Sequence, residues 1–554
     1  MGRLRFGLAE YFARQSDFSS PKADLLSLSD RLLYHRAPFA GQYLLDNDEG
    51  GVKKGGFLWR LCEIIPGALS WSALILPLLL SLVWPSLVAL YILIFDLYWL
   101  FRAFYMAYYM ARSYHKMRRA LRSDFGARLK NLPKDDSLIV DWKKIYHTVI
   151  FATFGEELET LLPSVESVLE NDWPQKQKII VLAGEERDRE RLYRVGAELQ
   201  KKFGERLFAF LISEHPDGIA GELRGKGSGS KWAGQLLSKF AKEKGLNEDE
   251  IIVHIADADT RFERQYFNAV TFEFVTNPNR HRRTYQPIPL YSNNIWQTTN
   301  IARLAAWGSS FWQMIEASRP WRLVNFSTHA YSLRMLREMN YWAVDCVNED
   351  SRQFWRAYFA FDGDHEAVPI YLPVRMDAVL ADNFWTTLKN QYLQKRRWAY
   401  GVEHLPYILD ETIRNKKISR WDVTVKVSRL IEGAYTWATA TFYLMFVGWL
   451  PSIFSVTYRD TVLAHNFPVI SRLILSSAWV LLLVSVYISL SFLPPRPPGF
   501  RRHKYVEMVA EWLIMPISAI FFSSFPALEA QTRLMFGKYL GFWVTPKTGV
   551  RQVQ

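Results

Sequence analysis

Cysteine is nearly absent from this chain of 554 residues, which contains only Cys62 and Cys346. Neither lies in a Cys-x-x-Cys pair or beside a cluster of His and Cys residues, so we expect neither a disulfide scaffold nor a structural zinc site. The first sixty residues also lack an apolar stretch, because nine Lys/Arg and seven Asp/Glu are spread through them. We therefore expect no cleavable secretory signal, and membrane targeting would come from internal segments.

The composition is not that of a disordered or collagen-like chain. Hydrophobic residues make up 49% of the sequence and aromatic residues 15%, which is too much for either class. The mean hydropathy of -0.08 is nevertheless too polar for a protein built only from membrane spans. At about 150 residues per domain, the length allows about three folding units. These observations predict membrane segments joined to a sizeable soluble part.

Charge is missing from four stretches of the chain. The first, residues 64–95, has thirty-two uncharged residues where one span needs about 20, so it predicts a transmembrane helical hairpin that turns near Trp84-Pro85. A buried hairpin in a soluble domain is the alternative. Two more transmembrane helices are predicted over residues 433–458 and 473–495. Residues 512–528, seventeen in number and interrupted by two prolines, predict a re-entrant or fifth transmembrane segment.

Positive charge gathers beside these segments. Residues 111–146 hold ten Lys/Arg against four Asp/Glu, whereas the 451–469 loop has Arg459 as its only Lys/Arg. By the positive-inside rule, the N-terminus, the soluble middle and the C-terminal tail face the cytoplasm, which requires four crossings plus one re-entrant segment. We therefore expect a multi-pass protein of the cell (inner) membrane with a cytoplasmic soluble domain.

The net charge of +13 would suggest a nucleic-acid partner in a soluble protein. Here the cations lie beside predicted spans, where anionic lipid headgroups attract them, and no zinc-finger, RNP-like or helix-turn-helix pattern occurs. We expect the lipid bilayer as a partner and no nucleic acid. The chain then divides into an N-terminal cytoplasmic region (1–62), a transmembrane hairpin (63–110), a basic linker (111–146), a soluble domain (147–400), interfacial helices (401–430), two transmembrane helices (431–495), a re-entrant or fifth segment (505–530) and a cytoplasmic tail (531–554).

The soluble domain alternates short β-rich runs with helical stretches. Strands are predicted over 147–152, 178–182, 207–212 and 251–255, and helices over 157–170, 188–203 and 231–244. Strands separated by helices of this length predict an α/β domain whose parallel sheet is covered by helices on both faces. Ligands of such sheets bind at the carboxyl ends of the strands.

Three motifs follow in the soluble domain. Asp257-Ala-Asp259 ends the last predicted strand, where two carboxylates can hold one hard cation together with pyrophosphate oxygens; a solvated turn is the alternative. Asn348-Glu349-Asp350 precedes an amphipathic segment, and Asp350 is either a helix cap or a general base that takes the proton of an acceptor hydroxyl.

The third motif is Gln394-Lys-Arg-Arg397-Trp398, ahead of the third predicted span. Arg397 can neutralise the charge on a departing diphosphate, and Trp398 offers a flat apolar surface for a sugar ring. Alternatively, the segment is a basic flank of the membrane with an interfacial Trp. Charge alone does not distinguish these two interpretations.

Together, in this order and ahead of membrane segments, the three motifs resemble the family 2 membrane glycosyltransferases, which include the cellulose and hyaluronan synthases, over residues 145–550. The resemblance implies an α/β GT-A catalytic domain, a nucleotide-sugar-binding and Rossmann-like mixed sheet, combined with α-helical transmembrane segments. It also implies these roles: Asp259 chiefly binds Mg²⁺ or Mn²⁺, Asp257 shares the metal or contacts the ribose, Gln394 and Arg397 bind the nucleotide sugar, Trp398 binds the acceptor, and Asp350 is the base of an inverting transfer.

Weaker likenesses surround these motifs. Residues 542–547 are similar to the gating loop of cellulose synthases, which would bring Thr545 and Lys547 to the diphosphate; an interfacial aromatic tail is the alternative. Glu156 stands where the family has a Tyr/Asn-Glu element that binds the donor. Glu185 or Glu186 stands where an Asp holds the base, unless it only caps a helix. Lys226 lies in a glycine-rich stretch, 225–231, which we expect to be a turn that approaches phosphate or a loop without a ligand. The list of donor-binding candidates is therefore Glu156, Glu186, Lys226, Asp257, Gln394, Arg397, Thr545 and Lys547.

These features predict an inverting membrane glycosyltransferase. The donor would be a nucleotide-diphosphate sugar, a UDP- or GDP-sugar, and the acceptor a growing glycan, which means processive polysaccharide synthesis. One alternative is the transfer of a single sugar to a polyprenyl phosphate or another lipid-linked acceptor. The other is a non-catalytic glycan-binding or transport subunit, against which the six motif residues argue.

Overall fold

Four buried strands form the parallel half of an eight-stranded sheet in the computed structural model, which describes residues 54–133 and 140–545. They are β1 (Tyr146–Ala152), β2 (Lys178–Glu185), β3 (Ala209–His215) and β4 (Ile251–Asp257). Parallel pairing of β2 with β3, of β1 with β2 and of β1 with β4 gives the order β3-β2-β1-β4. Near-continuous apolar runs of this kind are typical of strands that helices cover on both faces.

The other four strands make the sheet mixed. They are β5 (Arg261–Phe262), β6 (Arg283–Tyr291), β7 (His329–Ser332) and β8 (Glu366–Met376). β7 runs antiparallel to β4 and β6, whereas β8 runs parallel to β6, and the complete order is β3-β2-β1-β4-β7-β6-β8-β5. A parallel half that continues through an antiparallel strand fits the GT-A domain that the sequence motifs lead us to expect. The chain therefore combines an α/β GT-A domain with long apolar helices.

A parallel sheet, expected from the alternation of strands and helices, is correct for β1 to β4 and for β6 and β8, which run in the same direction. It is wrong for β7 and β5, which run the opposite way. After β6 the chain passes through α10 (Asn300–Ala317) and a loop, and β7 then enters the sheet from the opposite end. A crossover helix produces a parallel strand only when the chain returns to the end of the sheet from which it started. The alternation of strands and helices along the sequence does not indicate to which end of the sheet the chain returns.

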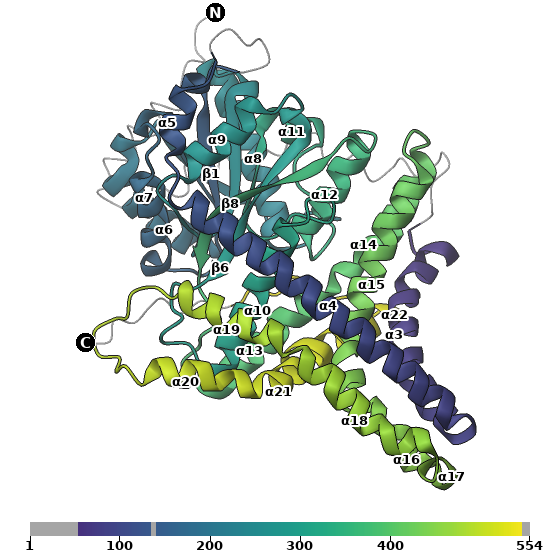
Figure 1. Ribbon diagram of the computed structural model, residues 1–554. Helices are drawn as coiled ribbons and strands as arrows, with labels where there is room; N and C mark the ends of the chain where they lie inside the picture. Colours follow the sequence, from purple (N-terminus) through teal and green to yellow (C-terminus); the bar gives the residue numbers. More distant parts are fainter. Residues whose placement is uncertain (1–53, 134–139, 546–554) are drawn as a thin grey trace, which may run out of the picture. The chain divides into compact units, whose positions relative to one another are not determined.

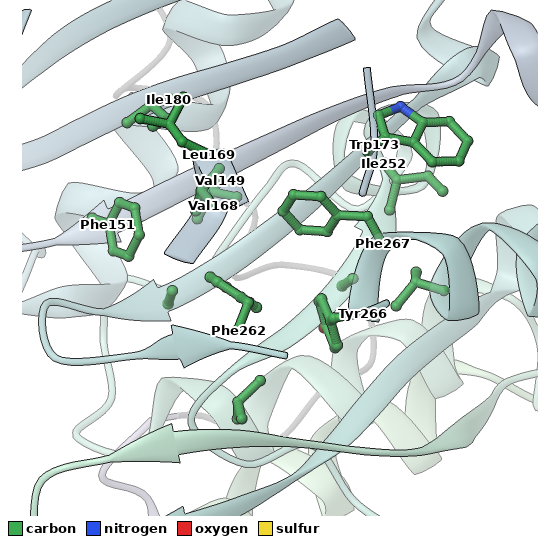
Figure 2. Packing of buried hydrophobic residues seen from close by; sticks show 14 of the residues in the cluster. Val149, Phe151, Val168, Leu169, Trp173, Ile180, Ile252, Phe262, Tyr266 and Phe267 are labelled. Carbon is green, nitrogen blue, oxygen red and sulfur yellow. The ribbon is translucent and has the colours of Figure 1, made fainter. Parts of the chain in front are cut away.

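Figure 2 shows the hydrophobic core against this sheet. Val149 and Phe151 of β1, Ile180 of β2 and Ile252 of β4 lie in one cluster with Phe267 of α9 (Tyr266–Thr276). All five side chains are fully buried. Burial of each such side chain contributes about 1.5–3 kcal/mol before its conformational entropy is counted. The core thus holds rigid the strands whose carboxyl ends carry the polar motifs.

Helix α8 (Lys226–Lys244) begins earlier than the sequence predicts. Residues 226–230, expected to form a glycine-rich turn, make the first turn of this helix, and Gly225 precedes it with a φ of 136°. A Cβ at Gly227 would lie 2.4 Å from the carbonyl oxygen of Ala343. The glycine therefore allows close approach of two backbone segments. The expected turn is the start of a helix instead, and phosphate binding by these residues stays a prediction. The other helices around the sheet are α5 (Phe125–Lys130), α6 (Leu158–Glu170), α7 (Arg189–Phe203), α11 (Leu333–Glu338) and α12 (Glu349–Ala360).

Four helical segments of the described residues are long and apolar enough to cross a membrane. The first two are α3 (Phe57–Val83) and α4 (Pro85–Ala120). The third, Val462–Ser491, comprises α18 (Val462–Ser477) and α19 (Trp479–Ser491). The fourth, Lys504–Met535, comprises α20 (Lys504–Ala510), α21 (Met515–Ala519), a π-helix (Ile520–Ser524) and α22 (Phe525–Met535). A fifth candidate, α15 (Arg420–Met445) with Val447–Phe454, is bent by 47°. The break between α3 and α4 lies at Trp84, where the sequence predicts a turn. Lys504–Met535 is 32 residues long and so extends well beyond the seventeen uncharged residues seen in the sequence.

The long helices pack on one another and on the sheet domain. α4 lies along α18 and α19 and also contacts α10 (Figure 1). α22 contacts both α3 and α13 (Phe384–Ala399), and Glu529 of α22 accepts hydrogen bonds from Tyr392 at 2.7 Å and Arg396 at 2.6 Å. The helix that carries the Gln394-to-Trp398 motif is therefore fixed to the apolar helices. Shorter elements complete the described chain: α14 (His404–Arg414), α16 (Leu450–Phe454) and α17 (Val456–Arg459).

The core gives a first prediction. Phe267→Ala removes a fully buried ring that stacks on His147 at 4.6 Å between centroids, and it leaves a cavity in the core. We expect a loss of about 3–5 kcal/mol and a lower midpoint of thermal unfolding of the detergent-purified protein. The exposed Glu198→Ala should stay within about 0.5 kcal/mol of the parent chain. Equal midpoints for both variants would contradict this account of the core.

Candidate active site

A cavity of about 750 Å³ lies at the carboxyl ends of β1, β2 and β4. The beginnings of α8 and α12 and the end of α13 also line it. On its far side it reaches residues of α4, α10 and α15. The cavity thus lies where α/β sheets bind ligands, and it joins the strand ends to the long helices.

Lys226 lies at the centre of a group of carboxylates in this cavity. Its Nζ is 3.1 Å from Asp257 Oδ1, 3.1 Å from Asp350 Oδ1 and 4.0 Å from Glu349 Oε1. Burial lowers the pKa of Lys226, but the three carboxylates raise it by more, so that the pKa lies above its ordinary value. The side chain is therefore a charged ammonium that holds the end of β4 and the start of α12 together.

Ser327 connects the same groups. Its Oγ donates a hydrogen bond to Asp257 Oδ2 at 2.9 Å, and its backbone N–H donates to Asp350 Oδ2 at 3.0 Å. Its carbonyl oxygen accepts a hydrogen bond from Lys226 Nζ at 3.2 Å. Its φ of 52° lies in the left-handed region, which costs free energy for a residue other than glycine. The surrounding hydrogen bonds offset this cost, as is common at functional sites.

Asp350 and Glu349 begin α12 but differ in exposure. The side chain of Asp350 is 22% exposed and lines the cavity, whereas that of Glu349 is 2% exposed. Burial raises the pKa of Asp350 and Lys226 lowers it in part, so that the pKa lies above the ordinary value. Burial and the charge of Asp350 raise the pKa of Glu349 to about 8. A carboxylate that faces the cavity with a raised pKa is suited to accept a proton.

Asp259 follows β4 and is almost fully buried in the cavity wall. Its Oδ2 accepts a hydrogen bond from the backbone N–H of Asp377 at 2.9 Å, and its carbonyl oxygen accepts one from Asn293 at 3.0 Å. Together with Asp257 it supplies carboxylate oxygens, the donors that Mg²⁺ and Mn²⁺ prefer. Residues 54–133 and 140–545 contain no group of three or more His, Cys, Asp or Glu side chains placed to bind a metal. A cation held by Asp257 and Asp259 would therefore need its other ligands from a bound substrate.

Acidic residues follow the neighbouring strands as well. Glu156 is buried and lines the cavity, where its Oε2 accepts a hydrogen bond from Thr153 at 2.9 Å. Glu185 is the last residue of β2 and also lines the cavity. Glu186 is not among the lining residues. Its side chain is 45% exposed and instead accepts a hydrogen bond from the backbone N–H of Asp217 at 2.9 Å. Of the two alternatives, the structure places Glu185 in the cavity.

Gln394, Arg397 and Trp398 all line the cavity from α13. The guanidinium carbon of Arg397 lies 5.0 Å from the centre of the Phe542 ring, and its Nε is buried without a hydrogen-bond partner in the described chain. Leaving such a group unsatisfied is costly, so Arg397 Nε is placed to donate to a ligand. The Trp398 ring packs edge-on against Phe326, with 5.3 Å between centroids.

The last described residues cover one side of the cavity. Residues 542–545 line it, and Thr545 is 7% exposed with a buried Oγ1 that has no partner among the described residues. The Phe542 ring lies so close to Gly225 that a Cβ there would be 2.5 Å from it. Thr545 therefore lies where the sequence places it, beside the other candidates. Lys547 lies outside the described residues.

The sequence motifs did not identify Ser327 as a candidate, nor two further residues of the site. Lys395 is buried, donates to Ser309 Oγ at 2.5 Å, and lies 4.7 Å from the centre of the Trp398 ring. Burial lowers the pKa of Lys395 to about 7. Its position inside the Gln394-to-Trp398 motif is the one sequence signal that could have found it.

The second is Glu403, which holds the loop ahead of Asp350. Its Oε1 accepts hydrogen bonds from the backbone N–H groups of Val347 and Asn348, both at 2.9 Å. Asn348 donates in turn to the carbonyl oxygen of Arg397 at 3.0 Å. Burial raises the pKa of Glu403 to about 7. These bonds make Glu403 a positioning residue, which no motif in the sequence indicates.

No protein-family model matches the sequence, and no curated protein sequence matches it. Among solved structures, the chain is similar to the mannosyltransferase PcManGT from Pyrobaculum calidifontis in complex with GDP-Man and Mn2+, with a TM-score of 0.36 and 13% identity over 78% of this chain and 100% of that chain. It is also similar to S. aureus TarS (TM-score 0.31, 11% identity, 64% of this chain and 57% of that chain) and to GalNAc-T7 with UDP, GalNAc and Mn2+ (0.31, 10%, 54% and 59%). The chain therefore spans little more than half the length of the last two.

The contacts of Glu403 give a second prediction. Glu403→Ala leaves two buried N–H groups without an acceptor, whereas Glu403→Gln keeps an oxygen in place. We expect the amides of Val347 and Asn348 to exchange with deuterium about 10–100-fold faster in the Ala variant and near the parent rate in the Gln variant. Exchange would be followed by mass spectrometry, with Asp410→Ala on α14 as the control. Unchanged exchange in Glu403→Ala would show that other contacts hold the loop.

Proposed function

We propose that this protein is an inverting glycosyltransferase of the family 2 type in the cell membrane, which transfers sugars from a nucleotide-diphosphate sugar to a growing glycan. The observation that carries the proposal is the arrangement around Lys226. Its ammonium group holds Asp257, a carboxylate suited to donor and cation, and Asp350, a carboxylate suited to take a proton, beside one cavity. An inverting transfer needs both functions close together and no nucleophile from the protein.

The donor would bind between the strand ends and α13. Glu156 and Glu185 lie at the ends of β1 and β2, where their carboxylates can accept hydrogen bonds from the base or ribose of a UDP- or GDP-sugar. Arg397 Nε and Thr545 Oγ1, both buried without partners in the described chain, can donate to diphosphate oxygens. Gln394 also lines the cavity and would contact the sugar.

Asp350 would act on the acceptor. As the acceptor hydroxyl oxygen attacks the anomeric carbon, its proton passes to the Asp350 carboxylate, and the bond from that carbon to the diphosphate oxygen breaks. The electron pair of this bond leaves with the diphosphate, where Arg397 stabilises the negative charge. Attack on the face opposite the leaving group inverts the anomeric configuration.

A divalent cation fits the same scheme. Asp259, with Asp257, would hold Mg²⁺ or Mn²⁺, which when bound supplies positive charge to the diphosphate. The backbone N–H of Asp377 and the amide of Asn293 keep Asp259 in place at the cavity wall. Lys226 orients Asp257 in the same way.

The extent of the cavity supports chain extension. Residues of α4, α10 and α15 line it together with Asp350 and Trp398, so an acceptor glycan can lie with its reacting end at Asp350 and its remainder beside the long helices. Four helices with the length and hydropathy of membrane spans support a multi-pass protein. The ten Lys/Arg of residues 111–146 support a cytoplasmic catalytic domain.

The proposed base gives a third prediction. Asp350→Asn keeps the shape of the side chain but cannot take a proton, so nucleotide release in the presence of acceptor should fall by about 10²–10⁴-fold. Donor affinity should change little. The detergent-purified protein would be incubated with a panel of UDP- and GDP-sugars, and released nucleotide and product size would be read together, with the exposed Glu366→Gln as the control.

Two results of this experiment would change the proposal. Full activity in Asp350→Asn would reduce Asp350 to a helix cap. A product that gains one sugar only, on a lipid carrier, would replace processive synthesis by single transfer, whereas a ladder of products supports chain extension.

The proposed cation site gives a fourth prediction. Removal of divalent ions with a chelator should weaken donor binding to the parent chain, and Mn²⁺ should restore it. Asp259→Asn loses a charged oxygen ligand, so its donor binding should no longer respond to Mn²⁺. Titration calorimetry with and without Mn²⁺ measures both effects. A normal Mn²⁺ response in Asp259→Asn would place the cation elsewhere.

A further inference from the structure

One part of the cavity lining, formed by residues of α4, α10, α15 and the loop after α10, is rich in aromatic side chains. Seven of the 21 tryptophans line the cavity, and Trp99, Trp312, Trp321 and Trp437 lie on this side. An indole presents a flat apolar face, which suits the apolar face of a sugar ring better than a flexible acyl chain. We call this part of the cavity the helix side.

The helix side also carries charge of both signs. Glu432 of α15 pairs with Arg102 of α4, and its second oxygen lies 3.5 Å from Arg322. Glu316 of α10 pairs with Arg319. Glu316 lines the cavity and Glu432 lies beside it. Both carboxylates have arginine partners, and in the described chain neither pairs with Lys426 or Arg429.

Arg429 and Lys426 of α15 are cations that line the cavity. Arg429 donates one hydrogen bond to the carbonyl oxygen of Trp321 at 2.9 Å and forms no ion pair within residues 54–133 and 140–545. Lys426 lies 3.5 Å from Asp422, a residue that is 48% exposed and does not line the cavity. The guanidinium group of Arg429 has further N–H groups that can bind a planar carboxylate. The helix side thus combines surfaces for sugar rings with a net positive charge.

We propose that the acceptor is an acidic glycan, whose sugar rings stack on the tryptophans of the helix side while a uronate carboxylate binds Arg429 and Lys426. This inference rests on the proposed glycosyl transfer and specifies its acceptor. A lipid phosphate would offer the same charge, but its hydrocarbon chain would need an aliphatic groove. The aromatic lining therefore favours a glycan.

The test compares two probes that differ only in charge. The first is a fluorescein-labelled pool of uronate oligosaccharides of mixed linkage, and the second is the same pool after chemical reduction of its carboxyl groups. Binding to the full-length protein is measured by fluorescence polarisation, and in parallel the donor panel is tested for nucleotide release. The acidic pool should bind about tenfold more tightly than the reduced pool, and its advantage should shrink as salt is added.

Two variants connect this preference to the named residues. The double variant Arg429→Gln with Lys426→Gln should bind both pools with similar affinity, because the cations that read the carboxylate are gone. Arg414→Gln removes a similar charge from α14 outside the cavity and should keep the tenfold preference. A preference that survives in the double variant would overturn the assignment to these two residues.

The outcomes separate this inference from the proposed function. Equal binding of both pools, while nucleotide release continues, overturns the acidic acceptor and leaves the glycosyltransferase standing. Stronger binding of a polyprenyl phosphate in nanodiscs than of the acidic pool replaces the glycan by a lipid acceptor. Absence of nucleotide release and of donor binding across the panel contradicts the proposed function, whereas the polarisation measurement still decides whether the cavity prefers acidic glycans.

Discussion

The buried ammonium group of Lys226 is the interaction on which the candidate site depends. It joins carboxylates that lie far apart in sequence, at the end of β4 and at the start of α12, and Ser327 completes the same network. Carboxylates this close repel one another in a buried cavity, so they stay together only while a cation lies between them. Loss of that charge would leave buried carboxylates uncompensated, which is more costly than the loss of a surface ion pair. The positions of α8, β4 and α12 therefore depend on one another.

A second consequence concerns the long helices. α13 carries residues of the cavity on one face and is held to α22 by hydrogen bonds from Tyr392 and Arg396 to Glu529. α4 and α15 are joined by the ion pair of Arg102, which lines the cavity, with Glu432. The walls of the cavity therefore come from the sheet domain and from apolar helices together. Asp350 lines this cavity, which residues of both parts enclose.

Much of the fold and part of the site can be predicted from local patterns. The apolar run that ends at Asp257 predicts a buried strand with its carboxylates at a ligand-binding edge, and β4 lies there. The long uncharged runs predict helices, and helices are present. Patterns failed where a residue acts through distant partners. Glu403 and Ser327 carry no motif, because their roles come from hydrogen bonds to segments more than twenty residues away. The glycines near Lys226 suggest a turn, although Gly227 serves close packing against Ala343.

The sequence by itself determined which segments are helices or strands, which are long and apolar, and which side chains can bind a ligand or transfer a proton. These properties depend on neighbours within a few positions. The tertiary structure decided the direction of β7, the choice of Glu185 over Glu186 for the cavity, and the gathering of Lys226, Asp257 and Asp350 at one point. It also decided that Arg429 of the cavity wall forms no ion pair within the described residues. Charge pairing depends on distance in space, and the folding of the chain sets those distances between residues that are from about thirty to more than a hundred positions apart.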